Sequence, residues 1–152
     1  MKNKGFSMVE LIIVIAIMAI LAGALAPALI KYINKSRVST DISNGQQIAS
    51  AIQTAMSNEQ AYDDANDATT EDYATYYGAQ GASMKAELDS ILGSGSASNL
   101  KTKAKKDKNN TVQNPQVFYV TVDVKNNHVT VYAGTDDASH TVYPSVGACW
   151  SY

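Results

Sequence analysis

The chain has 152 residues, a length that suits a single domain of ordinary size. Its 12 basic and 14 acidic side chains give a formal net charge of -2, which argues against a protein dedicated to nucleic acid because such proteins are usually strongly basic. The single cysteine, Cys149, excludes an intrachain disulfide, and together with His128 and His140 it lacks the spacing of a metal-ligand set. We therefore expect no metal and no cofactor.

The first predicted element is an apolar helix over residues 11–30, a segment without any charged side chain. At about 1.5 Å per residue such a helix is roughly 30 Å long, the thickness of the hydrocarbon core of a membrane. The segment is therefore a candidate membrane span. Glu10 stands immediately before it, where a carboxylate is unfavourable unless another group pairs with it.

An ordinary secretory signal peptide is an alternative interpretation of the same residues. Its apolar core would be residues 11–21, followed by the cleavage sites Ala22-Gly23-Ala24 and Ala24-Leu25-Ala26. Two observations count against it. Glu10 stands at the start of the apolar core, and the apolar pattern continues past these sites into a long polar helix.

Residues 22–27 are the weakest part of the predicted helix. Pro27 has no N–H and its ring clashes with the carbonyl of Gly23, which is itself a poor helix former. We expect the helix to kink or to melt here, and the sequence does not decide between a harmless kink and a functional melt. Small residues also recur four apart, a spacing that lets helix backbones pack closely in an apolar environment: Ala19 and Gly23, Ala22 and Ala26, Ala24 and Ala28.

The following residues predict an amphipathic continuation of this helix. Apolar or small side chains recur at steps of three and four, the period of one helix face: Val38, Ile42, Gly45, Ile48, Ala49, Ile52, Ala55 and Met56. We expect one helix from about Ser7 to about Gln60, with a folded domain covering the apolar face of its second half.

Residues 58–82 are polar and predict a surface loop with helical turns at most. Their acidic residues lack the spacing of a calcium-binding loop and predict a solvated face: Asp63, Asp64, Asp67, Glu71 and Asp72. Ser83 is expected to cap a short helix over residues 84–92, which Gly93 ends. The apolar face of that helix consists of Met84, Leu88, Ile91 and Leu92.

A basic segment follows, formed by Lys101, Lys103, Lys105, Lys106 and Lys108. We interpret it as a solvated loop, because no aromatic residues alternate with the lysines. Contact with a polyanion, nucleic acid included, is the alternative.

Residues 118–133 predict a β-hairpin, because apolar and polar side chains alternate with period two on both sides of Asn126-Asn127. With these two residues as the turn, the predicted register pairs Val124 with Val129, Val122 with Val131 and Val120 with Ala133. Residues 140–143 can add a third strand. The resulting antiparallel sheet has one apolar face that the long helix can cover, so the predicted fold class is α+β. His128 is expected on the exposed side of the sheet.

The stretch Gly5-Phe6-Ser7-Met8-Val9-Glu10-Leu11, after a leader with Lys2 and Lys4, resembles the class III signal of type IV pilins and pseudopilins. Pro27 is also at the usual place for this family. The resemblance covers roughly residues 1–35, and the rest of the chain agrees with the family in outline. It implies the pilin fold, a long helix packed on a small antiparallel sheet.

In that family a prepilin peptidase cuts after the glycine and methylates the new N-terminal residue. The resemblance therefore implies cleavage between Gly5 and Phe6, N-methylation of Phe6, and pairing of Glu10 with the terminal amine of a neighbouring subunit. The implied parts are a leader (1–5), a transmembrane and filament-core helix (6–30), an amphipathic helix of the head (31–60), a variable helix–loop region (61–115), and an antiparallel sheet with a C-terminal loop (116–152).

The resemblance implies a structural subunit of a type IV pilus rather than an enzyme: a single-pass membrane protein first, then part of an extracellular filament. Its partners would be copies of itself, the prepilin peptidase, the pilus assembly machinery and membrane lipid. A pseudopilin of a type II secretion or DNA-uptake system is the alternative, and a secreted monomeric binding protein is the remote one. The residues do not distinguish among motility, adhesion, DNA uptake and secretion.

Many pilins, chiefly Gram-negative ones, hold their C-terminal region with a disulfide. Cys149 is the single cysteine here, which agrees with a Gram-positive major pilin. We expect Cys149 to be a small buried residue. We expect either the packing of Tyr143, Trp150 and Tyr152 or contacts with neighbouring subunits to hold the C-terminal loop in place of a disulfide.

Overall fold

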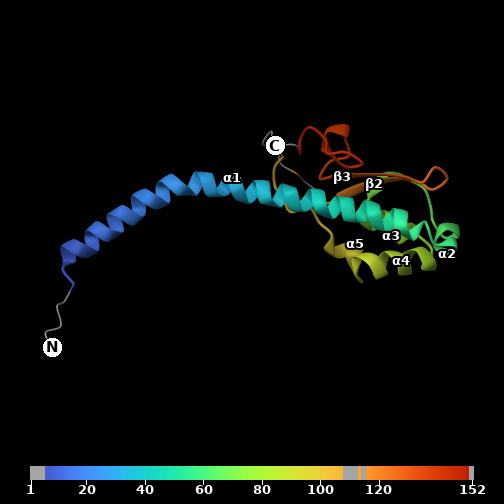
Figure 1. Cartoon of the computed structure of the whole chain (residues 1–152), viewed down its shortest axis with the longest axis horizontal. Helices are drawn as coiled ribbons and strands as arrows, with labels where there is room; N and C mark the ends of the chain where they lie inside the picture. Colours follow the sequence, from blue (N-terminus) through green and yellow to red (C-terminus); the bar gives the residue numbers. More distant parts are fainter. Residues whose placement is uncertain (1–5, 108–112, 114–115, 151–152) are drawn as a thin grey trace, which may run out of the picture. The chain divides into compact units, whose positions relative to one another are not determined.

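The longest element is the helix α1, Met8–Ala55 (Figure 1). The computed structural model describes residues 6–107, 113 and 116–150, and the chain divides into two compact units, Met1–Lys35 and Ser36–Tyr152. Within the first unit α1 is continuous through Gly23 and Pro27. A kink or a melt at these two residues in an assembled filament stays a prediction.

The end of α1 lies at Ala55 and not near Gln60, because a new helix starts shortly afterwards. The side-chain oxygen of Asn58 accepts hydrogen bonds from the N–H groups of Gln60 and Ala61, at 3.0 and 3.3 Å. Asn58 is thereby the N-cap of α2, Glu59–Asp63. The cap thus starts a second helix after α1 has ended.

The second half of α1 buries the face that its periodicity predicts. Among the predicted residues Ile42 is half-buried, and the buried ones are Val38, Gly45, Ile48, Ala49, Ile52, Ala55 and, just beyond the end of α1, Met56. The helix also buries Asp41 and Ala51, which the apolar pattern does not include. The carboxylate of Asp41 therefore needs partners inside the second unit.

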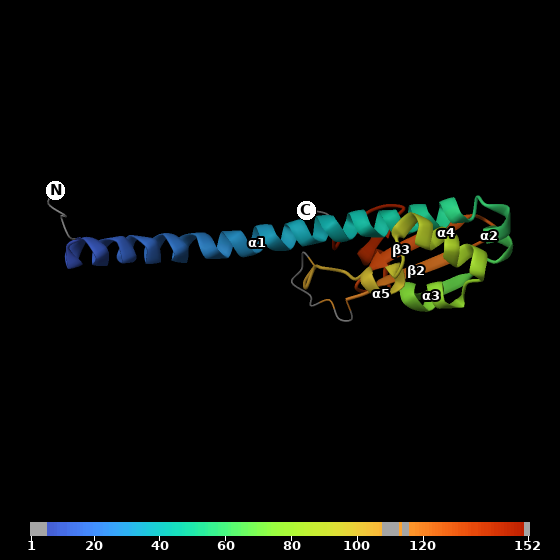
Figure 2. The same cartoon turned by 90° about the horizontal axis from the view of Figure 1, so that it is seen from below.

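A four-stranded antiparallel sheet completes the core of the second unit, with strand order β1-β2-β3-β4 among the described residues. The strands are β1 (Ala68–Asp72), β2 (Phe118–Asp123), β3 (His128–Ala133) and β4 (Thr141–Tyr143). Buried side chains alternate with more exposed ones along β2 and β3, and the buried ones join those of α1 in a single core. Figure 2 shows the second half of α1 running alongside these strands. The predicted α+β arrangement is confirmed, and His128 is exposed as predicted.

The register of β2 and β3 differs from the predicted one by two residues: Val122 pairs with Val129, Val120 with Val131 and Phe118 with Ala133. The predicted two-residue turn is wrong, because the loop spans residues 124–127 and the N–H of Asn127 donates to the carbonyl of Val124 at 3.2 Å. Asn127 has a φ of 48°, which asparagine tolerates better than most residues. Because side chains alternate with period two, a shift of two residues leaves each of them on its predicted face.

The region over residues 58–82 is more structured than the predicted surface loop. Besides α2 it contains β1, which forms an edge of the sheet beside β2, and α3, Tyr73–Ala79. Tyr73 and Tyr76 are 2% and 0% exposed. Burial of two tyrosines in a core thus fixes a segment that carries no alternating apolar pattern.

Three acidic residues of this region do more than form a solvated face, because each accepts a backbone N–H. Asp64 accepts from Ser83 at 2.8 Å, Asp67 from Val124 at 2.8 Å and Asp72 from Thr75 at 3.0 Å. The hydrogen bonds from Ser83 lower the pKa of Asp64, and those from Thr75 lower the pKa of Asp72. The three carboxylates therefore fix the backbone of the segments that they accept hydrogen bonds from.

The helix α4, Ala82–Leu92, is not capped by Ser83 as predicted. Gly81 occupies the N-cap position, and Asp64 supplies the acceptor for the Ser83 N–H. Of the predicted apolar face, Met84 and Leu88 are buried, Leu92 is half-buried and Ile91 is 43% exposed. Gly93 ends the helix with a φ of 88°, and the short helix α5, Ser96–Asn99, follows.

Gly45 lies where β4 approaches α1 closely. A Cβ atom on Gly45 would lie 2.3 Å from Cγ2 of Val142, well inside van der Waals contact. The sequence alone presents Gly45 as a residue that weakens the helix. In the folded unit it is the residue that allows strand and helix to pack at this distance.

We expect Gly45→Ala to destabilise the folded chain although alanine is the better helix former. Helix propensity favours alanine by about 1 kcal/mol, whereas overpacking against Val142 costs about 1–3 kcal/mol. The net loss in the free energy of unfolding should be about 1 kcal/mol, and Gly45→Val should lose more. Denaturant unfolding of the full chain in detergent measures it. Gly78→Ala in α3 is the matched control, because a Cβ there meets nothing within 4 Å. A Gly45→Ala variant more stable than wild type would contradict this account.

Candidate functional site

The first turn of α1 is held by a reciprocal pair, Ser7 and Glu10. Glu10 Oε2 accepts the backbone N–H of Ser7 at 2.9 Å, and Ser7 Oγ accepts the N–H of Val9 at 3.3 Å. This is a variant of the capping box, which supplies acceptors for N–H groups that the first helical turn leaves unpaired. Within a single chain, Glu10 therefore stabilises the start of α1, where a negative charge also interacts favourably with the helix dipole.

Phe6 directly precedes this pair and is 84% exposed. Gly5, the other residue of the predicted cleavage site, lies outside the described residues. The structure thus brings Phe6, Ser7 and Glu10 together at the start of α1. Gly23 and Pro27 lie further along the same helix and do not join them.

The apolar half of α1 is exposed all round in the single chain. Its large apolar side chains range from 42% exposed at Val14 to 81% at Met8. Among the described residues α1 is the one helix that is long and apolar enough to cross a membrane, by length and composition. Gly23 has open space around it, since a Cβ there would meet nothing within 4 Å. A surface of this kind requires lipid or other apolar helices around it.

Residues 1–26 match the family model of the prokaryotic N-terminal methylation motif. Two type IV major fimbrial proteins FimA of Dichelobacter nodosus are each 43% identical to this chain over 54 residues, which is 36% of this chain and 35% and 34% of theirs. The chain is type IV pilin-like. The alignments span about a third of the length of these fimbrial relatives, and no solved structure matches the chain.

The basic segment of this pilin-like chain lies on the surface of the second unit. Lys101, Lys103, Lys105 and Lys106 are exposed, whereas Thr102 and Ala104 between them are buried. Lys108 lies outside the described residues. The alternation directs the charged side chains outward, so a solvated loop and a polyanion-binding loop both agree with it. The polyanion contact stays a prediction.

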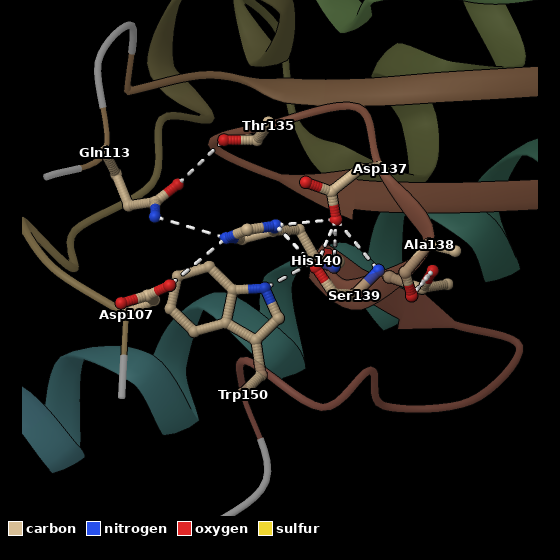
Figure 3. Close-up of polar contacts among 9 residues, drawn as sticks. Asp107, Gln113, Thr135, Asp137, Ala138, Ser139, His140 and Trp150 are labelled. Atoms are coloured by element: carbon tan, nitrogen blue, oxygen red, sulfur yellow. Dashed lines mark hydrogen bonds and ion pairs between the residues drawn. The ribbon is translucent and has the colours of Figure 1, made fainter. Parts of the chain in front are cut away.

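The C-terminal loop is held by polar contacts around His140, which is 6% exposed (Figure 3). His140 lies in the 3₁₀ helix η1, Ala138–His140, just before β4 and not within the predicted third strand. Its Nδ1 lies 2.8 Å from Asp137 Oδ1, its Nε2 lies 3.5 Å from Asp107 Oδ2, and its ring meets that of Trp150 edge-on. Hydrogen bonds from Ser139, and to a smaller extent from His140, lower the pKa of Asp137 to about 2.

The expected packing of the C-terminal aromatic residues is confirmed where the structure describes it. Trp150 is 1% exposed and donates its Nε1–H to the carbonyl of His140 at 3.0 Å. The hydroxyl of Tyr143 donates to Gln53 Oε1 of α1 at 3.0 Å. Cys149 is buried as predicted, and Tyr152 lies outside the described residues.

Asp41 is a residue that the sequence analysis misses, because a lone acid on an apolar helix face carries no motif. Its two carboxylate oxygens accept the backbone N–H groups of Lys103 and Ala104, each at 2.7 Å. Burial raises the pKa of Asp41, while these hydrogen bonds oppose the rise. Asp41 thus ties the basic segment to α1 within the second unit.

We expect Asp41→Ala to lower the free energy of unfolding by about 2–4 kcal/mol, because it leaves two backbone N–H groups without their acceptor. Thermal or denaturant unfolding of the full chain in detergent measures the loss. Asp63→Ala, at an exposed position of α2, is the control and should change stability by less than about 0.5 kcal/mol. Equal effects of the two substitutions would contradict the anchoring role of Asp41.

Proposed function

We propose that this chain is the structural subunit of a type IV pilus. It is inserted in the membrane as a prepilin, cleaved between Gly5 and Phe6, methylated at Phe6, and polymerised through α1 into a surface filament. The observation that carries the proposal is the methylation motif at the start of a helix whose apolar half is exposed on every side. The fimbrial names of the two relatives support it.

The apolar half of α1 has two suitable environments in this proposal. Before assembly, lipid surrounds it, since its length matches a bilayer core. After assembly, copies of the same helix surround it, and the small residues four apart allow their backbones to approach. The partners of the chain are therefore lipid, copies of itself, the prepilin peptidase and the assembly machinery. Its location changes from the membrane to the cell surface.

Glu10 changes partners between the two states. In the single chain its carboxylate accepts the Ser7 N–H at 2.9 Å and remains exposed, so its charge is tolerated. In a core of packed helices an unpaired carboxylate is strongly unfavourable, and so is an unpaired terminal amine. Pairing Glu10 with the amine of Phe6 of a neighbouring copy satisfies both groups. A wrongly placed subunit would leave both charges unpaired, so the pair would set the register of assembly.

A pseudopilin of a secretion or DNA-uptake system is the second candidate, because it requires the same N-terminal processing and the same apolar helix. The amount and the length of the filaments distinguish the two. Shearing cells and finding long filaments composed mainly of this chain would favour the pilus. Short or absent filaments with normal processing would favour the pseudopilin. A secreted monomer is the remote candidate, and it predicts a mature chain that begins beyond the Ala-x-Ala sites.

The mature protein should begin at Phe6 and carry one methyl group on its N-terminal nitrogen. Mass spectrometry of the N-terminal peptide from cells that express the full chain measures this directly. The same measurement on cells without the prepilin peptidase is the control and should show the uncleaved leader. A mature chain that starts at residue 25 or 27 would exclude the pilin class and support the signal-peptide alternative.

Glu10→Ala should leave processing intact and reduce filament yield at least a hundredfold. The removal of one partner from a buried ion pair costs about 3–5 kcal/mol, and each 1.4 kcal/mol is about a factor of ten. The amount of sheared filament is measured relative to the total amount of this chain in the cells.

Two variants distinguish the effect of the Glu10 charge from the effect of the helix cap. Glu10→Gln keeps a hydrogen-bond acceptor for Ser7 but not the charge, and should fail like Glu10→Ala. Ser7→Ala removes the hydroxyl alone and should assemble. Wild-type filament yield from Glu10→Gln would disprove the charge pairing.

A further inference from the structure

Three buried side chains from separate parts of the second unit converge beside the C-terminal loop: Asp107, His140 and Cys149. One potential ligand atom from each, a carboxylate oxygen, a ring nitrogen and a sulfur, lies within 4.8 Å of the other two. Asp107 precedes β2, His140 ends η1, and Cys149 follows β4. No sequence motif joins them, because the fold alone brings them together.

The backbone around these residues is fixed by its own hydrogen bonds. The N–H of Cys149 donates to the carbonyl of Ser139 at 2.9 Å, and the N–H of Gly147 donates to the carbonyl of Thr141 at 2.7 Å. A Cβ atom on Gly147 would lie 2.4 Å from the Ser139 carbonyl oxygen, so this close approach requires glycine. Cys149 is therefore held beside His140 by main-chain geometry and not by side-chain packing alone.

The orientation of His140 is that of a metal-binding histidine. Its Nδ1 is engaged by Asp137 Oδ1 at 2.8 Å, which directs Nε2 toward Asp107 Oδ2 at 3.5 Å (Figure 3). In histidines that ligate a metal, the N–H of the second ring nitrogen almost always donates a hydrogen bond to a carboxylate or a carbonyl. This hydrogen bond sets the tautomer and the orientation of the ring. Trp150 is 1% exposed and lies edge-on to the ring, so it covers one side of His140.

We propose that Asp107, His140 and Cys149 bind a zinc ion. The ligands would be one carboxylate oxygen of Asp107, Nε2 of His140 and Sγ of Cys149, with water in the fourth position of a tetrahedron. Ligand atoms of such a site lie about 3.3–3.8 Å apart, so separations of up to 4.8 Å need to contract by at most about 1.5 Å. On zinc binding, the Gln113 amide nitrogen would lose its 3.3 Å contact with His140 Nε2. The Gln113 amide oxygen would keep the hydrogen bond that it accepts from the Thr135 hydroxyl.

The set of donor atoms disfavours calcium and magnesium and suits zinc. Calcium and magnesium prefer oxygen ligands alone, whereas zinc accepts sulfur, nitrogen and oxygen together. On binding, the thiol of Cys149 loses its proton to solvent and ligates as thiolate. His140 ligates as neutral imidazole and donates its Nδ1–H to Asp137. No oxidant or reductant takes part.

The ion would cross-link three segments that are distant in the sequence, in a chain whose single cysteine allows no intrachain disulfide. It would tie the segment before β2 and the C-terminal turn to the start of β4. Binding to the folded state alone raises stability by mass action. This inference does not depend on whether the chain forms a filament.

Cobalt(II) is a suitable probe, because it takes zinc's place in tetrahedral sites and is coloured. The full chain in detergent, reduced and freed of metal with a chelator, is titrated with Co²⁺. We expect one equivalent to bind, with a thiolate-to-cobalt charge-transfer band and intense visible bands of tetrahedral cobalt, both abolished by Zn²⁺. We also expect Zn²⁺ at about 100 times its Kd to raise Tm by roughly 5–10 °C.

Variants assign the ligands. Cys149→Ser should lose the charge-transfer band, His140→Gln and Asp107→Asn should bind at least tenfold more weakly, and Asp137→Asn, a positioning residue, should weaken affinity about 10–100-fold. His128→Gln, at an exposed position of β3, is the matched control and should bind like wild type. Near-UV circular dichroism of the single tryptophan, Trp150, checks that each metal-free variant is folded.

Absence of the cobalt bands in the folded wild-type chain would overturn the proposal and leave a metal-free polar network around His140. An unchanged charge-transfer band in Cys149→Ser would overturn it equally, since the thiolate would then not be a ligand. If Cys149→Ser does not fold, the band in the wild-type chain still decides whether a thiolate binds the metal.

Discussion

The interaction on which this molecule depends is the burial of α1, and the two halves of the helix need different partners to achieve it. Residues of the second half bury one stripe in the core of the second unit, with Ile48 and Ile52 fully covered. The first half has no stripe, because apolar side chains surround it and all are exposed in the single chain. The chain itself therefore satisfies the second half, and only lipid or other chains can satisfy the first.

Within the second unit, the stripe on α1 is not purely apolar, and its exceptions determine how the other elements pack. Gly45 removes a side chain where Val142 of β4 comes close, and Asp41 supplies a buried carboxylate that holds the main chain of Lys103 and Ala104. Gly45 sets the distance between α1 and β4, and Asp41 sets the path of the loop that contains Lys103 and Ala104. Apolar area drives the helix onto the sheet, whereas these two positions specify the arrangement in which it packs.

Periodicity predicts the parts of the fold that repeat, and it fails for the parts that rest on single contacts. The period of 3.6 identifies the buried face of α1, and the period of two identifies β2 and β3. The same period cannot distinguish registers two residues apart, which explains the error at the turn before His128. Periodicity does not indicate β1, because this strand buries little besides Ala68. It does not indicate the site around His140 either, because the residues of that site meet only after the chain folds. The N-terminal motif, in contrast, consists of residues that are contiguous in the sequence, so it can be recognised without knowledge of the fold.

The C-terminal loop is stabilised differently from the rest of the core, and this difference bears on its surroundings. Asp107 and His140 are buried polar groups, and such groups stabilise a structure only while their hydrogen bonds and charges are satisfied. Apolar burial tolerates modest shifts, whereas a dry polar network loses stability as soon as one member is displaced. Cys149 lies within this network and is 6% exposed, so an oxidant or a second thiol can reach it only after the loop opens. The contacts that hold the loop thus also protect its thiol, and any ligand that tightens them strengthens both effects.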